Sequence, residues 1–392
     1  MPSQESPRLV VLVSLSAMAV LPINMFVPSL PNIAKDLNAD FALVNIAIAG
    51  YAMATAVTHL LAGALSDRFG RKPVALFALA IFTIASMGCG LATDITTFLL
   101  CRLFQGAVIA GYAVSLAIIH DTSDEGMVAS RIGYVSSAWA VAPMIGPAIG
   151  GFLDTGFGWR ANFIAFAVLG VSGLYLVAFH LKETKLHRSA ALTPQMWDYG
   201  ELCRAPLFWA HVLCMALSIG TLYVFLGGAP LVAAQLGGTS SAALGFYMGM
   251  VPAGFILGSH LVGRASTRQP AIGFMLTGRV LTCMGLLGGM VFVASGWMHP
   301  LAFFIPCVFV GLGNGLTMPV ANARVLSLHP QLAGTASGLA AAVTVMGAGV
   351  VAWLSGLVVN PLNAHMAVLS VMLITAGLSL AACLFIVDAD GK

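Results

Sequence analysis

Long apolar stretches separated by short polar breaks occupy almost the whole chain. Each stretch is close to the roughly 20 residues that a helix needs to cross the hydrocarbon core of a bilayer. Twelve such stretches lie near residues 9–30, 43–65, 73–93, 96–119, 131–153, 160–181, 207–230, 241–262, 270–294, 300–325, 333–356 and 363–387. The pattern predicts an all-α integral membrane protein with twelve transmembrane helices.

The longest polar break, residues 182–206, divides the predicted spans into six and six. We therefore expect an N-terminal six-helix bundle over residues 1–181, an inter-bundle loop over 182–206 and a C-terminal six-helix bundle over 207–392. The two halves resemble each other weakly: setting Pro73 against Pro270 aligns Arg71 with Arg268. A duplication of this kind is a known transporter plan, with the binding site between the halves.

Composition agrees with a lipid environment. Hydrophobic residues make up 59% of the chain and charged residues only 8%, whereas soluble domains carry about 25% charged residues. The net charge of +3 comes without a basic stripe, so we expect no nucleic-acid partner. The seven cysteines are scattered without metal-ligand spacing, and we expect neither a metal site nor a disulfide framework.

The distribution of basic residues predicts the orientation, because cytoplasmic loops carry an excess of Lys and Arg. Lys35 and Arg160 fall outside if the N-terminus is cytoplasmic. Thirteen then fall inside, namely Arg8, Arg68, Arg71, Lys72, Arg131, Lys182, Lys185, Arg188, Arg204, Arg264, Arg268, Arg324 and Lys392. Both termini and the 182–206 loop are therefore expected in the cytoplasm.

The most specific motif is the loop Gly63-Ala-Leu-Ser-Asp67-Arg68-Phe-Gly70-Arg71-Lys-Pro, after the second span. A glycine at 63 lets helices approach closely, Asp67 is placed to meet a helix N-terminus or an arginine, and Gly70 permits a tight turn. The loop resembles the helix 2–3 signature of the major facilitator superfamily, G-x-L-S/A-D-R-x-G-R-K/R. The alternative is an ordinary basic loop on the cytoplasmic side.

Two further segments resemble motifs of the same superfamily. The fourth span contains Arg102-Leu-Phe-Gln105-Gly106, which is similar to R-x-x-Q-G. The fifth is similar to the antiporter motif G-P-x-x-G-G, through Gly146, Pro147, Gly150 and Gly151. Glycines at these positions let helices pack closely and proline bends a helix; generic small-residue packing is the alternative. The resemblance implies the two-bundle major facilitator fold.

Within the superfamily the chain is similar to the drug:proton antiporters of the bicyclomycin and chloramphenicol exporter type (Bcr/CflA). The similarity lies in Pro28-Ser-Leu-Pro31, Ser66–Pro73, Gly158-Trp159-Arg160, Glu183-Thr184 and Phe225–Pro230. It implies efflux of a drug-like compound or metabolite, driven by protons through alternating access. A monomer in a bacterial inner membrane, linked to multidrug resistance, is the corresponding expectation.

One position departs from this pattern. Relatives usually carry an aspartate, a leading proton carrier, where this chain has Asn24, which cannot titrate. None of the fourteen acidic residues lies in the middle of a predicted span. His59, in the second span, has the side-chain type whose unperturbed pKa of about 6.5 suits a proton switch, and it is the proton-coupling candidate. A neutral, packed histidine is the alternative.

Two arginines lie well inside predicted spans, Arg102 in the fourth and Arg279 in the ninth. An intramembrane arginine is costly and marks either a functional cavity or a structural partner. Without an acid nearby, a cavity containing them favours an anionic or zwitterionic substrate. The other predicted substrate contacts are Asn24, Tyr51, Gln105, Tyr112 and Tyr223; each could instead bridge helices. For Arg279 a misplaced span boundary is a further alternative.

The sequence contains no nucleotide-binding P-loop, no hydrolase motif and no pair of catalytic carboxylates. We therefore expect a secondary transporter without cofactor or metal, and not an enzyme; a receptor or channel is the other class considered. Within transport, the proton-coupled exporter competes with an uncoupled or otherwise coupled facilitator or importer of a small metabolite, with anions among the candidates. The antiporter motif favours export, Asn24 weakens the case for proton exchange, and the sequence does not identify the substrate.

Overall fold

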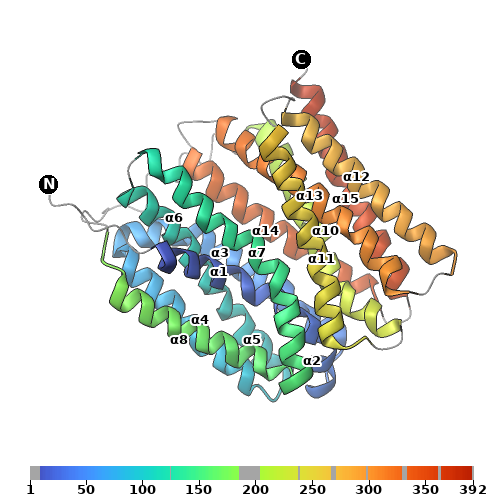
Figure 1. Ribbon diagram of the computed structural model, residues 1–392, viewed down its shortest axis with the longest axis horizontal. Helices are drawn as coiled ribbons and strands as arrows, with labels where there is room; N and C mark the ends of the chain where they lie inside the picture. The colour runs from blue at the N-terminus through green and yellow to red at the C-terminus, as the bar shows by residue number, and fades with distance from the viewer. Residues whose placement is uncertain are drawn as a thin grey trace.

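The protein is described by a computed structural model that covers residues 9–123, 125–184, 204–236, 239–265, 271–296, 299–328, 333–360 and 363–390. Within these ranges the regular structure is helical and no strand is present. Figure 1 shows long helices packed side by side, with the N-terminal helices in blue to green and the C-terminal helices in yellow to red.

The N-terminal helices comprise the elements up to residue 180. They are α1 (Leu9–Asn24), η1 (Val27–Ser29), α2 (Leu30–Asp36), α3 (Phe41–Phe69), α4 (Arg71–Leu91), α5 (Ile95–Gln105), η2 (Gly106–Ile109), α6 (Ala110–Thr122), α7 (Glu125–Phe157) and α8 (Arg160–His180). The C-terminal helices are α10 (Pro206–Gln235), α11 (Ser241–Ala265), α12 (Ala271–Ala294), α13 (Pro300–Leu328), α14 (Ala333–Val358) and α15 (Ala364–Asp390).

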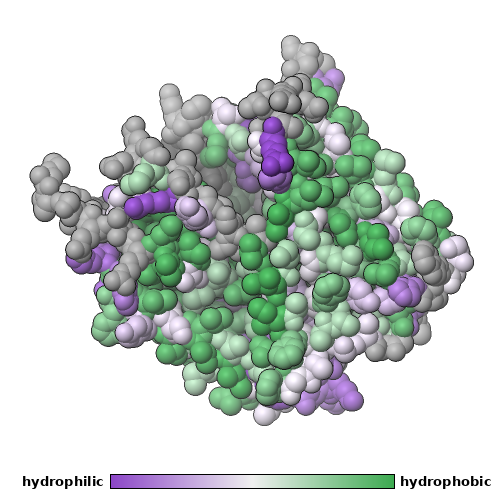
Figure 2. Space-filling view, viewed as in Figure 1, coloured by the Kyte–Doolittle hydropathy of each residue, from purple (hydrophilic) through white to green (hydrophobic). Residues whose placement is uncertain are grey.

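Length and hydropathy qualify eleven helical stretches of the described residues as candidate membrane spans. The remaining expected span, 131–153, lies within the 33-residue α7, and several side chains of that helix are not among those that the structure describes. In Figure 2 hydrophobic residues cover most of the middle of the visible face, and hydrophilic ones gather toward its edges. The chain is therefore a multi-pass membrane protein.

Helix α4 illustrates how sequence selects the lipid-facing side. Phe77, Ile84 and Leu91 recur every seven residues, so they share one face of the helix, and they are 69%, 71% and 76% exposed. The opposite face buries small and polar side chains, among them Ala75, Ala78, Ala85, Ser86 and Cys89. Leu79 and Phe82 are also buried on that side, and the small side chains between them allow neighbouring helices to pack closely.

Two predicted spans are interrupted rather than continuous. The span expected at 9–30 is broken after Asn24, where α1 ends, and continues as η1 and α2. Pro28 lies in the break, and it lacks the N–H that a continuous α-helix would use. The span expected at 96–119 is broken at Gly106, where the short 3₁₀ helix η2 begins. Such breaks inside a helix often mark functional positions.

The helices of each group pack mainly on one another, although α10 also contacts η1, α2 and α3, and α11 contacts η1. Two long pairs make most of the contact between the groups. Helix α7 packs along α11, and α3 packs along α14. Most of the predicted 182–206 loop lies outside the described residues, as does Arg268 of the proposed repeat. The division at residues 181 and 207 therefore stays a prediction.

Candidate functional site

The interruptions of the first and fourth spans meet around Arg102, which is completely buried. The Arg102 guanidinium carbon lies 4.0 Å from the centre of the Phe26 ring and 4.7 Å from that of Tyr51. Phe26 belongs to the break after α1, and Tyr51 belongs to α3. Two aromatic faces therefore hold the cation by cation–π attraction, which strengthens when the groups are removed from water.

The polar contacts of Arg102 are incomplete. Its Nη1 donates to Oε1 of Gln105 at 2.6 Å, and Gln105 Nε2 donates to Oγ of Ser86 at 2.7 Å. Arg102 Nε and Nη2 have no hydrogen-bond partner among the described residues. Leaving a buried donor unsatisfied costs about 1–3 kcal/mol, and more when the group is charged. The cluster therefore holds a cation with unused hydrogen-bonding capacity.

The glycine of this motif explains how the cluster closes. A Cβ at Gly106 would lie 2.7 Å from Cβ of Ala54 and 3.2 Å from the carbonyl oxygen of Tyr51. Only glycine lets η2 approach α3 this closely without displacing it. The R-x-x-Q-G segment thus supplies the cation, its hydrogen-bond acceptor and the room to bring them to Tyr51.

The remaining predicted contacts in the N-terminal helices do not all join this cluster. Asn24 is buried and donates from Nδ2 to the carbonyl oxygen of Val20 at 3.0 Å, inside its own helix. Tyr112 is partly buried and packs beside Val20 and Ala142. In the C-terminal helices, Tyr223 is partly buried and packs against the core cluster that also contains Tyr51. Their roles as substrate contacts stay predictions.

Arg279, also completely buried, lies in a different environment from Arg102. Its Nε donates to Oγ1 of Thr317, its Nη1 to Oγ of Ser218 and its Nη2 to Oδ1 of Asn314, at 3.0, 2.7 and 2.8 Å. Asn314 Nδ2 in turn donates to the carbonyl oxygen of Ser218 at 3.1 Å. These partners lie on α10 and α13 and join C-terminal helices to each other. The geometry favours structural pairing over a cavity wall.

His59, the proton-coupling candidate, lies in α3 and is partly buried. Among the described residues it makes no hydrogen bond and no ion pair. It precedes Asp67 by eight residues, about 12 Å along a helix that rises 1.5 Å per residue. No acid is placed beside it, and its role stays a prediction.

The loop between α3 and α4 is organised around buried Arg71. Its Nη2 pairs with Oδ1 of Asp67 at 2.8 Å, its Nε with Oδ2 of Asp121 at 3.1 Å, and its Nη1 donates to Oγ of Ser66 at 2.5 Å. Asp121 lies near the end of α6, so the network joins two loops on the same side. The motif therefore fixes the α3–α4 turn to the end of the fourth span.

Glu183 completes this loop, and sequence reasoning had marked it only as part of a resemblance. Its carboxylate accepts from the backbone N–H groups of Arg71 at 2.9 Å and Lys72 at 3.2 Å, at the start of α4. An anion is stabilised there because the first N–H groups of a helix lack internal partners. Gly70 adopts φ of 104°, and a Cβ there would collide with the Glu183 carboxylate. Both facts require glycine at position 70.

Two other positions of the motif act differently from the expectation. No described atom lies within 4 Å of where a Cβ on Gly63 would be, so close helix approach does not explain that glycine. Arg68 does not join the Arg71 network; its guanidinium carbon lies 5.3 Å from the ring centre of neighbouring Phe69. The prediction of close packing at Gly63 is wrong for the described residues.

The G-P-x-x-G-G motif lies where α7 meets its neighbours. A Cβ at Gly150 would lie 1.6 Å from the carbonyl oxygen of Met25, and a Cβ at Gly151 would lie 2.0 Å from that of Ser241 in α11. In return, a Cβ at Gly245 of α11 would lie 2.1 Å from the carbonyl oxygen of Pro147. We call this contact, Pro147 and Gly151 against Ser241 and Gly245, the glycine seam. By contrast, a Cβ at Gly146 would lie 3.4 Å from Cβ of Asn24, which is an ordinary contact distance.

A hydrogen-bonded acid that sequence reasoning had placed at a helix end lies beside the glycine seam. Oδ2 of Asp154 accepts from Nδ2 of Asn32 at 2.6 Å and from Oγ of Ser241 at 2.5 Å. Asp154 is only 5% exposed, and its Oδ1 has no partner among the described residues. The carboxylate thus joins α2 and α7 to α11. A signal was present in its position three residues after Gly151, almost one helical turn later on the same face.

Comparison with known proteins agrees with this architecture. Residues 12–352 match the family model of the Major Facilitator Superfamily. The multidrug resistance protein MdtL of Escherichia coli O9:H4 (strain HS) is 30% identical over 348 residues, which cover 86% of this chain and 85% of MdtL. The chain belongs to the Major Facilitator Superfamily, and it is a transporter of small molecules rather than an enzyme.

Solved structures show the same fold at low sequence identity. A D-xylose–proton symporter superposes with a TM-score of 0.78 at 16% identity, covering 96% of both chains. A bacterial homologue of the human lysosomal transporter Spinster, in an inward-facing and occupied conformation, gives 0.72 at 17% identity, covering 97% of this chain and 94% of that one. The prediction of an all-helical major facilitator fold is confirmed.

Proposed function

We propose that this transporter exports a small molecule from a bacterial cytoplasm by alternating access, in exchange for protons, as a drug:proton antiporter of the Bcr/CflA type. The similarity to a multidrug resistance protein supports the class of substrate. The basic residues support an inner-membrane orientation with both termini in the cytoplasm. In that orientation the end of α7 and the start of α11 face the outside of the cell.

The observation that carries alternating access is the glycine seam. It joins N-terminal and C-terminal helices through backbone contacts at one end of the molecule. The Asp154–Ser241 hydrogen bond lies at the same end. Closing the outer end in this way favours access from the cytoplasm, and separating the two groups of helices there would open the outside. Residues 1–181 and 207–392 are the two halves that we propose to move.

The Arg102 cluster supports an anionic or zwitterionic substrate. Two of its guanidinium nitrogens, Nε and Nη2, are buried without a hydrogen-bond partner among the described residues, and a carboxylate or phosphate oxygen is the strongest acceptor for them. Phe26 and Tyr51 cover the guanidinium, so a substrate reaches it only when one of these rings moves. Asn24, Gln105, Tyr112 and Tyr223 are the proposed further contacts, and Arg279 is the least favoured because its donors are satisfied.

Proton exchange needs a titratable group, which Asn24 does not supply. None of the described acids lies beside Arg102. His59 is the proposed proton carrier because it lies in α3, the helix that also carries Tyr51. The alternative, an uncoupled facilitator or importer of a small anion, is favoured by Asn24 alone.

The test is transport into inside-out membrane vesicles with an imposed pH gradient, acidic inside. A growth screen of deletion and overexpression strains against drugs, amino acids and organic acids supplies the substrate. We expect accumulation that collapses when an uncoupler is added and that is reduced by His59→Ala. Accumulation that ignores the uncoupler would remove proton exchange, and transport only down the substrate gradient would establish the facilitator.

A further inference from the structure

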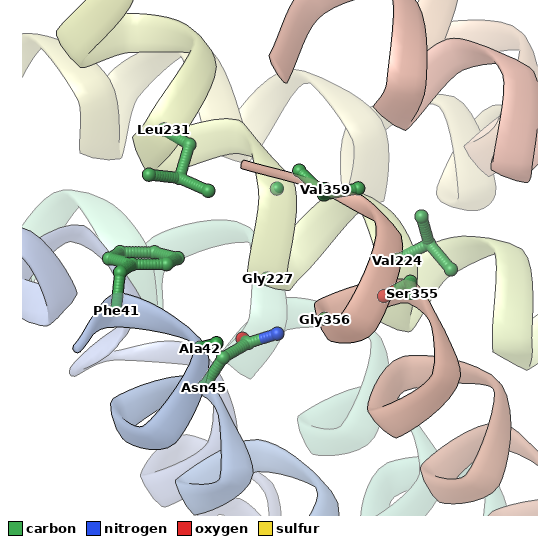
Figure 3. Close-up of a pocket in the computed structure, with 10 residues that line it drawn as sticks. Phe41, Ala42, Asn45, Val224, Gly227, Leu231, Ser355, Gly356 and Val359 are labelled. Carbon is green, nitrogen blue, oxygen red and sulfur yellow. The ribbon is translucent and has the colours of Figure 1, made fainter. Parts of the chain in front are cut away.

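A groove of about 260 Å³ lies between the start of α3 and the last turns of α14. It is lined by Asp40, Ala42, Leu43, Asn45, Ile46, Trp353, Gly356 and Leu357. A smaller pocket, drawn in Figure 3, adjoins it on the side of α10 and shares Asn45. Since α3 and α14 belong to different groups of helices, whatever fills the groove contacts both.

The deep end of the groove is closed by Asn45, which also borders the smaller pocket. Asn45 is only 7% exposed, and its Oδ1 has no hydrogen-bond partner among the described residues. Figure 3 shows its side chain reaching from α3 into the space between Gly227 and Gly356. A Cβ at Gly227 would lie 2.5 Å from that oxygen, so glycine there makes room for the amide. The oxygen is buried against α10 and does not open into the groove, so Asn45 closes the deep end without recognising the occupant.

The mouth of the groove carries a negative charge and an aromatic ring. Asp40 is exposed, accepts from the backbone N–H of Ala42 at 3.0 Å through Oδ1, and has no cation within ion-pair distance among the described residues. Trp353, on the facing helix, is 49% exposed. A carboxylate and an indole face are the two groups that attract an ammonium ion most directly. The polar groups of the groove thus favour a cation that donates hydrogen bonds.

The outer wall of the groove is apolar and belongs to the lipid-facing surface. Leu43 and Leu357 are both exposed, on α3 and α14 respectively. The cavity is too small for a whole phospholipid, because one water already occupies about 30 Å³ in the liquid, but it is large enough for a headgroup. Tryptophan is also enriched at the depth of lipid headgroups. The occupant is therefore expected to keep its hydrocarbon outside the groove.

We propose that this groove binds one phospholipid with a primary-ammonium headgroup. The ammonium lies between Asp40 and Trp353 and donates to the Asp40 carboxylate, and the acyl chains run along α3 and α14. The lipid holds the two groups of helices together at this contact. The site is defined by the groove residues alone. Its place in the outer leaflet follows from the proposed orientation, in which the start of α3 faces the outside of the cell, and so rests on the proposed function.

The test is lipid retention by the purified full chain, measured by native mass spectrometry in detergent. The probes are phosphatidylethanolamine, phosphatidylglycerol and phosphatidylcholine with identical acyl chains. We expect one phosphatidylethanolamine per chain, retained about fivefold over the other two. Phosphatidylglycerol lacks a cation for Trp353 and Asp40, and the quaternary ammonium of phosphatidylcholine has no N–H to donate to the Asp40 carboxylate. Equal retention of the ethanolamine and glycerol lipids would overturn the proposal.

Two variants localise the effect. Asp40→Asn removes the charge but keeps a good helix cap, since Asn and Asp cap equally well, and Trp353→Leu removes the ring. We expect each to lower the preference to about twofold or less. Phe77→Leu, at an exposed lipid-facing position of α4, is the matched control and keeps it. An unchanged preference in Asp40→Asn would contradict the proposal, provided that its thermal unfolding matches the wild type.

A final arm separates a lipid from a soluble amine. Glycerophosphoethanolamine has the same headgroup without acyl chains, and in excess it is expected not to displace the bound lipid. Displacement would show that the site recognises a soluble compound and would overturn the lipid assignment. Retention does not depend on transport, so a failure of the proposed export function leaves this result readable.

Discussion

Gly151 of α7 and Ser241 of α11 touch through their backbones: a Cβ at Gly151 would lie 2.0 Å from the carbonyl oxygen of Ser241. The contact is mutual, because Gly245 of α11 meets the carbonyl oxygen of Pro147 in the same way. Small residues are what allow helix backbones to meet inside a membrane. The antiporter motif thus has a physical role here, since it lets the two groups of helices close against each other.

Replacing Gly151 by alanine is predicted to prevent this closure. The added methyl group overlaps backbone rather than a movable side chain, and overpacking of this kind costs about 1–3 kcal/mol. We expect transport to fall about tenfold or more, together with a longer distance between spin labels at residues 156 and 246. Pulsed electron paramagnetic resonance measures that distance.

Gly156→Ala is the matched control for the seam, because it changes the same residue type in the same helix. No described atom lies within 4 Å of a Cβ at that position, so transport should stay near the wild-type rate. If both alanine variants transport equally well, the seam does not need glycine.

Asp154 is predicted to stabilise the closed seam through its two hydrogen bonds. Asp154→Ala removes the acceptor of both Asn32 and Ser241, and hydrogen bonds to a charged group contribute about 1.5–3 kcal/mol each. The distance between labels at 156 and 246 should therefore shift toward longer values. Asp154→Asn keeps the shape and should give a smaller shift; no shift in either variant would contradict the role.

Replacing each buried arginine by glutamine is predicted to affect a different property, namely thermal stability for Arg279 and transport for Arg102. Arg279→Gln leaves Thr317, Ser218 and Asn314 without their donor, and we expect a loss of about 1–3 kcal/mol in stability, seen as earlier thermal unfolding in detergent. Arg102→Gln removes two unsatisfied donors along with the charge. Its stability should change less, whereas uptake of an anionic substrate should fall at least tenfold.

Either of two results would contradict the roles proposed for these arginines. Arg102→Gln could transport every anionic candidate at the wild-type rate, or Arg279→Gln could unfold no earlier than Arg102→Gln. The first would remove Arg102 from the substrate site, and the second would remove Arg279 from its structural role.

Gly70→Ala is predicted to disrupt the α3–α4 loop. Its φ of 104° is strained for any residue with a Cβ, at a cost of about 1–3 kcal/mol, and the methyl group meets the Glu183 carboxylate. We expect lower thermal stability and slower transport. Gly63→Ala, in the same motif, meets no described atom and should behave as the wild type; equal damage from both would show that sterics at Gly70 are not the cause.

The sequence was sufficient for the spans, because a run of about 20 apolar residues has one stable solution in a bilayer. It did not predict the breaks after Asn24 and at Gly106, because each stretch as a whole is long and apolar enough to pass for one continuous span. The R-x-x-Q-G motif located Arg102 and Gln105. Their neighbour Phe26 lies in the break after α1. A span predicted as one continuous helix gave no reason to place Phe26 beside Arg102.

Contacts between distant helices were the part that single-sequence reasoning could not supply. The three partners of Arg279 lie 38, 61 and 35 residues away along the chain. Asp154 resembled an ordinary helix-end acid until α11 was placed beside it. Which face of α7 meets α11 depends on packing around the glycines, and hydropathy does not record that.

The central claim is exchange of a proton for an exported substrate. The most direct measurement is the lumenal pH of acid-loaded inside-out vesicles, reported by a trapped dye, when the identified substrate is added outside. We expect the lumen to become more alkaline as the substrate enters, and to do so at least tenfold more slowly with Gly151→Ala. Substrate entry at constant lumenal pH would contradict it.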